Sequence, residues 1–161
     1  MIVTKTDTRG VLTYANDVFL RLSALTEQEA IGQPHSLIRH PEMPRAVFKL
    51  LWDTLKGQKE IFAYVVNLAS DGAHYWVLAH VTPSYDGNKR VTGYHSNRRK
   101  PEPAAVAAAS RLYAQLRAEE RRHSSSPAGL DASWAMLHRM LDERGQTYDT
   151  FVWELTNGVA A

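Results

Sequence analysis

The chain has 161 residues, no cysteine and a formal net charge of +2, with 44% apolar and 22% charged residues. This composition is typical of one globular domain with a short appendage, and it excludes a wholly disordered chain and a fibrous repeat. The absence of cysteine excludes disulfides, thiolate metal sites, iron–sulfur clusters and covalently attached haem. The small net charge, with Lys and Arg in short clusters, argues against nucleic-acid binding.

The N-terminus lacks the charged-then-apolar pattern of a signal peptide, and no apolar run reaches the roughly 18 residues that a membrane span needs. We therefore expect a cytoplasmic protein that does not insert into a membrane.

The chain begins with two β-favouring runs, residues 2–6 and 11–15, on either side of a turn that contains Gly10. This pattern predicts a β-hairpin, so the first two strands are expected to be antiparallel neighbours.

Three helices are predicted next. Asn16 or Asp17 is placed to cap a short helix, and Thr26 and Glu29 have the spacing of a capping box for a second one. A longer helix is expected from Pro44 to Gly57, since proline suits a first helical turn and glycine a helix end. Its apolar stripe consists of Phe48, Leu51, Trp52 and Leu55.

Residues 61–68, 74–82 and 91–97 form three strand-like runs that are joined by turn sequences. Together with the opening hairpin they predict an α+β fold: a five-stranded antiparallel sheet with short helices on one face.

From residue 101 the chain changes to helix-forming composition, which places a domain boundary between residues 1–100 and 101–161. A first helix is expected to about residue 120, then a flexible linker over about 121–129, then a helical hairpin that Asp131 caps. We expect this hairpin to mediate association, because two helices cannot bury both of their faces alone; folding back on the sheet is the alternative. Its apolar residues are Trp134, Leu137, Leu141, Tyr148, Phe151 and Leu155.

No Gly-rich phosphate loop, no nucleophile elbow and no zinc-protease motif is present, so the sequence does not indicate an enzyme. His74 and His80 are expected on one face of a strand, and the sequence offers no obvious carboxylate partner for them, which argues against a metal site. The densest group of functional side chains is residues 32–44, GQPHSLIRHPEMP, in which three prolines stiffen a segment with one Arg, two His and one Glu. Such a segment suits either a bound anionic group or a solvated polar turn.

Several motifs together resemble, in order and spacing, the PAS domain of bacterial aerotaxis receptors of the Aer type, over about residues 2–100. They are Asn16-Asp-Val-Phe, Gly32-Gln-Pro-His, Arg39-His-Pro-Glu-Met-Pro, Phe48-Lys-Leu-Leu-Trp-Asp-Thr-Leu-Lys-Gly and Asp71-Gly-Ala-His-Tyr-Trp-Val. The resemblance implies a PAS fold that holds FAD noncovalently and reports redox state. It implies that the flavin-binding residues are Arg39, His40, Glu42, Trp52 and Asn67.

The expected function is therefore a flavin-binding redox or oxygen sensor in aerotaxis, with no enzymatic activity. Since the chain stops at Ala161, it resembles a separate PAS subunit that works with a membrane-bound chemotaxis transducer, and a homodimer is a further expectation. Two alternatives stay open: a haem-binding PAS gas sensor, and a cofactor-free interaction module. The second is favoured by three departures from the family: Glu42 in place of the usual Asp, Ile61 in place of a Trp, and Leu-Ala-Ser in place of basic residues after Asn67.

Overall fold

The computed structural model describes residues 1–158, and its backbone contacts divide the chain into two compact units. The first unit combines residues 1–40 with 54–100. The second combines residues 41–53 with the chain from residue 101 onward. The second unit is therefore discontinuous in sequence, and helix α3 (Arg45–Lys56) runs through the division.

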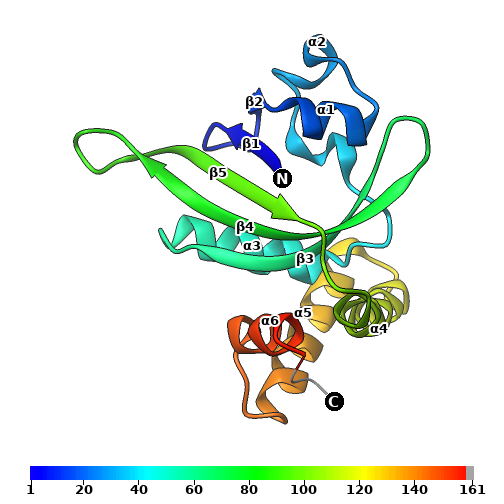
Figure 1. Cartoon of the computed structure of the whole chain (residues 1–161). Helices are drawn as coiled ribbons and strands as arrows, with labels where there is room; N and C mark the ends of the chain where they lie inside the picture. Colours follow the sequence, from blue (N-terminus) through cyan, green and yellow to red (C-terminus); the bar gives the residue numbers. More distant parts are fainter. Residues whose placement is uncertain (159–161) are drawn as a thin grey trace. The chain divides into compact units, whose positions relative to one another are not determined.

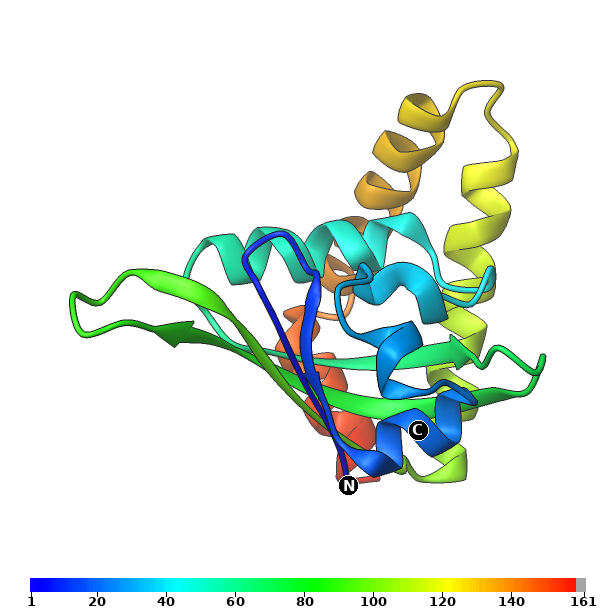
Figure 2. The same ribbon diagram turned by 90° about the horizontal axis from the view of Figure 1, so that it is seen from above.

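The first unit is built on a five-stranded antiparallel sheet with the strand order β2-β1-β5-β4-β3 (Figure 1). The strands are β1 (Ile2–Thr6), β2 (Leu12–Ala15), β3 (Ile61–Leu68), β4 (His74–Tyr85) and β5 (Val91–Arg99). The hairpin of β4 and β5 extends past β1 and β2 in both views (Figures 1 and 2). The predicted strands are thus confirmed, with β4 and β5 longer than expected at their C-terminal ends.

Three short helices connect β2 to α3 and cover one face of this sheet. They are α1 (Asp17–Ser23), α2 (Glu27–Ala30) and the 3-10 turn η1 (His35–Ile38). Asn16 caps α1 by accepting a hydrogen bond from the backbone of Phe19, and the predicted capping box of Thr26 and Glu29 is present at α2. Local sequence signals therefore fix where both helices begin.

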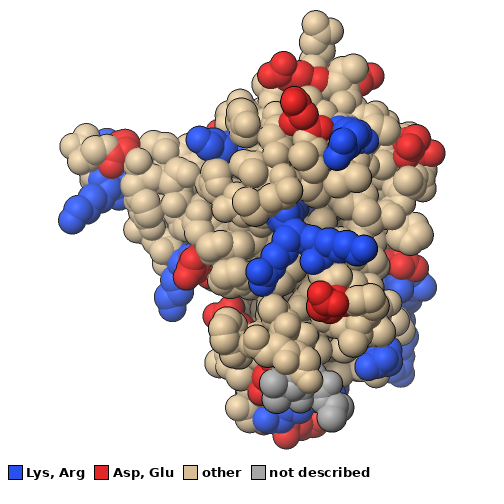
Figure 3. Space-filling model, in the orientation of Figure 1, with Lys and Arg blue, Asp and Glu red and all other residues tan. Residues whose placement is uncertain are grey.

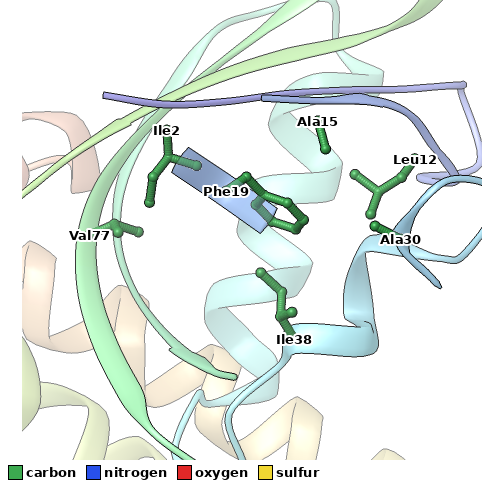
Figure 4. Packing of buried hydrophobic residues seen from close by; sticks show 7 residues of the cluster. All are labelled: Ile2, Leu12, Ala15, Phe19, Ala30, Ile38 and Val77. Carbon is green, nitrogen blue, oxygen red and sulfur yellow. The ribbon is translucent and has the colours of Figure 1, made fainter. Parts of the chain in front are cut away.

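The core of the first unit lies between these helices and the sheet. Figure 4 shows Phe19 of α1 and Ile38 of η1 directed toward the same interior as Ile2 of β1 and Val77 of β4. All four side chains are buried, so Ile2 and Val77 mark the face of the sheet that the short helices cover. We call this the inner face.

The second unit contains α4 (Pro103–Arg121), α5 (Ser126–Asp142) and α6 (Tyr148–Thr156). Helices α4 and α5 run side by side (Figure 2). Helix α5 begins at Ser126, where Ser125 accepts a hydrogen bond from the backbone of Ala128, and not at Asp131. The linker predicted over 121–129 is accordingly wrong in extent, because Ser125 and Pro127 start the helix within it.

A largely buried carboxylate joins the pieces of the second unit. Glu120 of α4 accepts hydrogen bonds from Ser133 Oγ of α5 at 2.9 Å, from the backbone N of Ala46 at 3.2 Å and from Arg45 Nε at 3.3 Å. Arg45 also donates to the backbone oxygen and the hydroxyl of Ser126. The start of α3 is thereby fastened to α4 and α5.

The apolar residues that were expected to mediate association are covered within the chain. Trp134 is half-buried, and its ring lies 4.5 Å from Lys49 Nζ. The remaining five are buried: Leu137, Leu141, Tyr148, Phe151 and Leu155. A third helix, α4, and residues 41–53 complete the unit, so burial of these side chains does not require association with another chain. Association itself stays a prediction.

Candidate functional site

The polar side chains of the inner face follow from the register of the sheet. Directly paired residues of antiparallel strands point their side chains to the same face. Starting from Ile2 and Val77, this rule assigns Asn67, Ser96 and Arg98 to the inner face. The pairs that establish it are Ile2 with Arg98, Ala79 with Arg98, Thr4 with Ser96, Val81 with Ser96, and Tyr75 with Asn67.

Three polar atoms on this face have no hydrogen-bond partner among the described residues. They are Asn67 Nδ2, Ser96 Oγ and Arg98 Nη1, on side chains whose residues are 3%, 5% and 6% exposed. An unsatisfied buried polar group costs about 1–3 kcal/mol, and more when it is charged. Three such groups on one face of a sheet indicate a place where a polar ligand supplies the missing partners.

Arg98 is held by a histidine of the covering segment. Arg98 Nη2 donates to His35 Nε2 at 2.6 Å, and Thr4 Oγ1 lies 3.5 Å from the same nitrogen. The ring of His35 also packs on that of Phe19, with centroids 5.9 Å apart. None of the ion pairs found in residues 1–158 includes Arg98, so its buried positive charge has a neutral acceptor and no carboxylate partner; the phenol of Tyr75 also acts on it.

Burial sets the protonation of this pair. Desolvation, followed by the neighbouring Arg98 cation and the more distant Arg39 cation, holds the pKa of His35 well below its usual value. Desolvation lowers the pKa of Arg98 to about 10, so it stays charged at neutral pH. A neutral His35 leaves Nε2 as the acceptor that the short contact with Arg98 requires.

Two of the five predicted site residues are brought together directly. Arg39 and Asn67 form an isolated antiparallel bridge, which joins the segment after η1 to β3. Burial lowers the pKa of Arg39. His40, next in the chain, packs the edge of its ring on His74, with centroids 5.8 Å apart.

The other two predicted residues belong to the second unit. Glu42 is exposed and forms an ion pair with Arg117 of α4 at 3.6 Å. Trp52 is half-buried on α3. Within the first unit the geometry thus assembles Arg39, His40 and Asn67, but the roles of all five residues stay predictions.

Sequence reasoning missed Ser96 and Arg98. Arg98 stands in the run Arg98-Arg99-Lys100, which has the composition of a solvated strand end. The available signal was the alternation of Tyr94, Ser96 and Arg98, because a strand with one buried face repeats every second residue. Burial raises the pKa of Tyr94, which lies on the same face.

The family model described as "PAS fold" matches residues 12–98, which include the inner face from β2 to β5. The chain belongs to the PAS fold family. The predicted PAS fold is thereby confirmed.

This PAS chain is also similar to individual proteins in sequence and in structure. It is 39% identical to the aerotaxis receptor of Escherichia coli (strain K12) over 117 residues, covering 73% of the chain and 23% of the receptor. The light-state structure of the blue-light photoreceptor Aureochrome1 LOV has a TM-score of 0.59 at 21% identity, covering 73% of this chain and 91% of that one. A light-oxygen-voltage domain described with a flavin analogue has a TM-score of 0.60 at 20% identity, covering 76% and 88%.

The PAS chain spans about a quarter of the receptor's length, so the similarity concerns a part of that protein. No helix in residues 1–158 has the length and apolar character that crossing a bilayer requires. Over the same residues, no three His, Asp or Glu side chains are grouped as a metal site. Basic and acidic side chains are interspersed on the face drawn in Figure 3, which is consistent with the low net charge.

Proposed function

We propose that the PAS unit binds FAD noncovalently against its inner face and acts as a redox or oxygen sensor, without catalysing a reaction. The main support is that three buried polar atoms without partners lie on the inner face of a chain that resembles an aerotaxis receptor.

The chemistry of the inner face fits a flavin. The isoalloxazine ring is planar and presents carbonyl oxygens and ring nitrogens along one edge. Asn67 Nδ2 and Arg98 Nη1 can donate to such acceptors, and Ser96 Oγ can donate or accept. Apolar side chains such as Val65 and Val77 provide the surroundings that planar ligands prefer. When bound, the flavin supplies a group that takes up and returns electrons.

The segment that follows η1 is well placed to respond to a change in the redox state of the bound flavin. Arg39 bridges to Asn67 through the backbone, so a change in the hydrogen bonds of the Asn67 amide acts on residues 39 and 40. The support for Glu42 and Trp52 as flavin contacts is the family resemblance alone.

We further propose that the signal passes to a partner protein, in aerotaxis or a related energy-sensing response in the cytoplasm. A membrane-bound chemotaxis transducer is the expected partner, and a homodimer is the alternative. The support is the similarity to a receptor that is named for aerotaxis.

The test is the visible absorption spectrum of freshly purified protein, followed by identification of the chromophore released on denaturation. We expect a yellow protein that releases FAD, with no light-driven cysteinyl adduct, because the chain has no cysteine. A haem spectrum would favour the gas-sensor alternative. A colourless protein that takes up no added FAD would contradict the proposal and favour a cofactor-free interaction module.

A further inference from the structure

The buried guanidinium of Arg98 is unusual because its hydrogen-bond acceptor is a neutral histidine. A buried arginine is ordinarily paired with a carboxylate, because an uncompensated charge in the interior costs several kcal/mol. Here the partner of Nη2 is His35 Nε2, and Nη1 has no partner among the described residues. The guanidinium is therefore fixed in place while its positive charge remains uncompensated.

The surroundings of His35 maintain this state. The side chains that face the imidazole are Thr4 of β1, Phe19 of α1 and Arg98 of β5, and the charge of Arg39 also acts on it. Two of these are cations and none is an acid. Protonation of His35 would place a further positive charge beside Arg98, so the imidazole stays a neutral acceptor that positions the guanidinium without cancelling its charge.

We propose that Arg98, positioned by His35, is the group that makes the inner face selective for the reduced, anionic form of the bound flavin. The inference rests on the proposed function, because it concerns the same site. Reduction adds electrons to the ring, and a reduced ring that stays deprotonated carries a negative charge. A fixed cation stabilises that charge, whereas it interacts more weakly with the neutral oxidised ring.

The neutral partner is essential to this selectivity. If a carboxylate held Arg98, the pair would have almost no net charge and would discriminate poorly between the two ring states. With His35 as the partner, the full charge of Arg98 acts on the ligand, so Arg98 raises the reduction potential of the flavin.

The experiment compares the reduction potential and the FAD affinity of the parent protein with those of Arg98→Gln, which keeps amide donors and removes the charge. We expect Arg98→Gln to bind reduced FAD about 10 to 100 times more weakly relative to oxidised FAD. At about 30 mV per tenfold change for a two-electron couple, its potential should fall by roughly 30 to 60 mV.

Arg99→Gln is the matched control, because Arg99 follows Arg98 in the chain but is exposed. Its potential should equal that of the parent. Arg98→Lys keeps the charge and should retain most of the parent's potential; it also covers the case in which Arg98→Gln does not fold.

The outcomes separate the inference from the proposed function. If the parent binds no flavin, both are wrong. If the parent binds FAD and Arg98→Gln leaves the potential unchanged, the inference is wrong and the flavin assignment stands. If Arg98→Lys lowers the potential as much as Arg98→Gln, the charge of Arg98 is not the determinant and the inference is equally overturned.

Discussion

Each unit holds one charged side chain that is buried or largely buried, and the two differ in their hydrogen-bond partners. In the second unit, the Glu120 carboxylate accepts hydrogen bonds from Arg45, Ala46 and Ser133. In the first unit, Arg98 has one neutral acceptor and an unsatisfied N–H group. The Glu120 carboxylate therefore has its partners within the protein, whereas the inner face leaves polar atoms without partners, as the proposed flavin site requires.

The largest expected effect is at the satisfied site. Glu120→Ala removes three hydrogen bonds to a carboxylate, so we expect the free energy of unfolding to fall by about 3 kcal/mol. Chemical denaturation of both proteins measures it. Glu119→Ala is the neighbouring control: Glu119 pairs with the exposed Arg122 and with His123, and its loss should cost much less than the loss of Glu120. Equal effects of the two substitutions would show that Glu120 contributes no more to stability than Glu119.

At Arg98, substitution should raise the free energy of unfolding instead of lowering it. Arg98→Met removes a buried charge without an acid partner, so the flavin-free protein should become more stable by about 1–2 kcal/mol, while flavin affinity falls. Thr4 Oγ1 can then donate to His35 Nε2, which limits the loss of the histidine contact. Denaturation of flavin-free parent and variant measures the difference. A destabilisation as large as that of Glu120→Ala would mean that Arg98 is a structural residue and would erase the contrast.

The third effect is on the pH dependence of stability, and it is absent at neutral pH. Because the pKa of His35 is well below its usual value in the folded state, unfolding takes up a proton at mildly acidic pH. The free energy of unfolding keeps its full value above the unfolded-state pKa of His35, about 6.5. It decreases as pH falls below that value, by at most about 1.4 kcal/mol per pH unit. Chemical denaturation at several pH values between about 7.5 and about 5 should show this slope. His35→Gln should flatten it, whereas His123→Gln, at an exposed position, should leave it unchanged.

Most of the fold could be predicted from local sequence signals. The capping residues Asn16 and Thr26 fix two helix starts, and the alternation of residues 61–68 and 74–82 fixes two strands, because these features depend on neighbours in the chain. The assignment of residues 41–53 to the second unit could not be predicted, since it depends on contacts with residues about 75 positions later.

The candidate site shows the same division. The segment with Arg39 and His40 is recognisable from its composition, since three prolines and several charged side chains stand close together. Arg98 is not recognisable in this way, because its burial depends on the pairing of β5 with both β1 and β4. A one-residue shift of that register would place Arg99 on the inner face instead.

The discontinuity of the second unit has a consequence for the way the protein is made. The start of α3 is fastened to Glu120, which is synthesised 74 residues after Ala46. At typical translation rates this interval lasts roughly 4 to 15 s, during which Ala46 and Val47, both buried in the finished protein, lack the helices of their own unit. During this interval the growing chain carries the start of an amphipathic helix without its partner helices, so the second unit is completed late in synthesis.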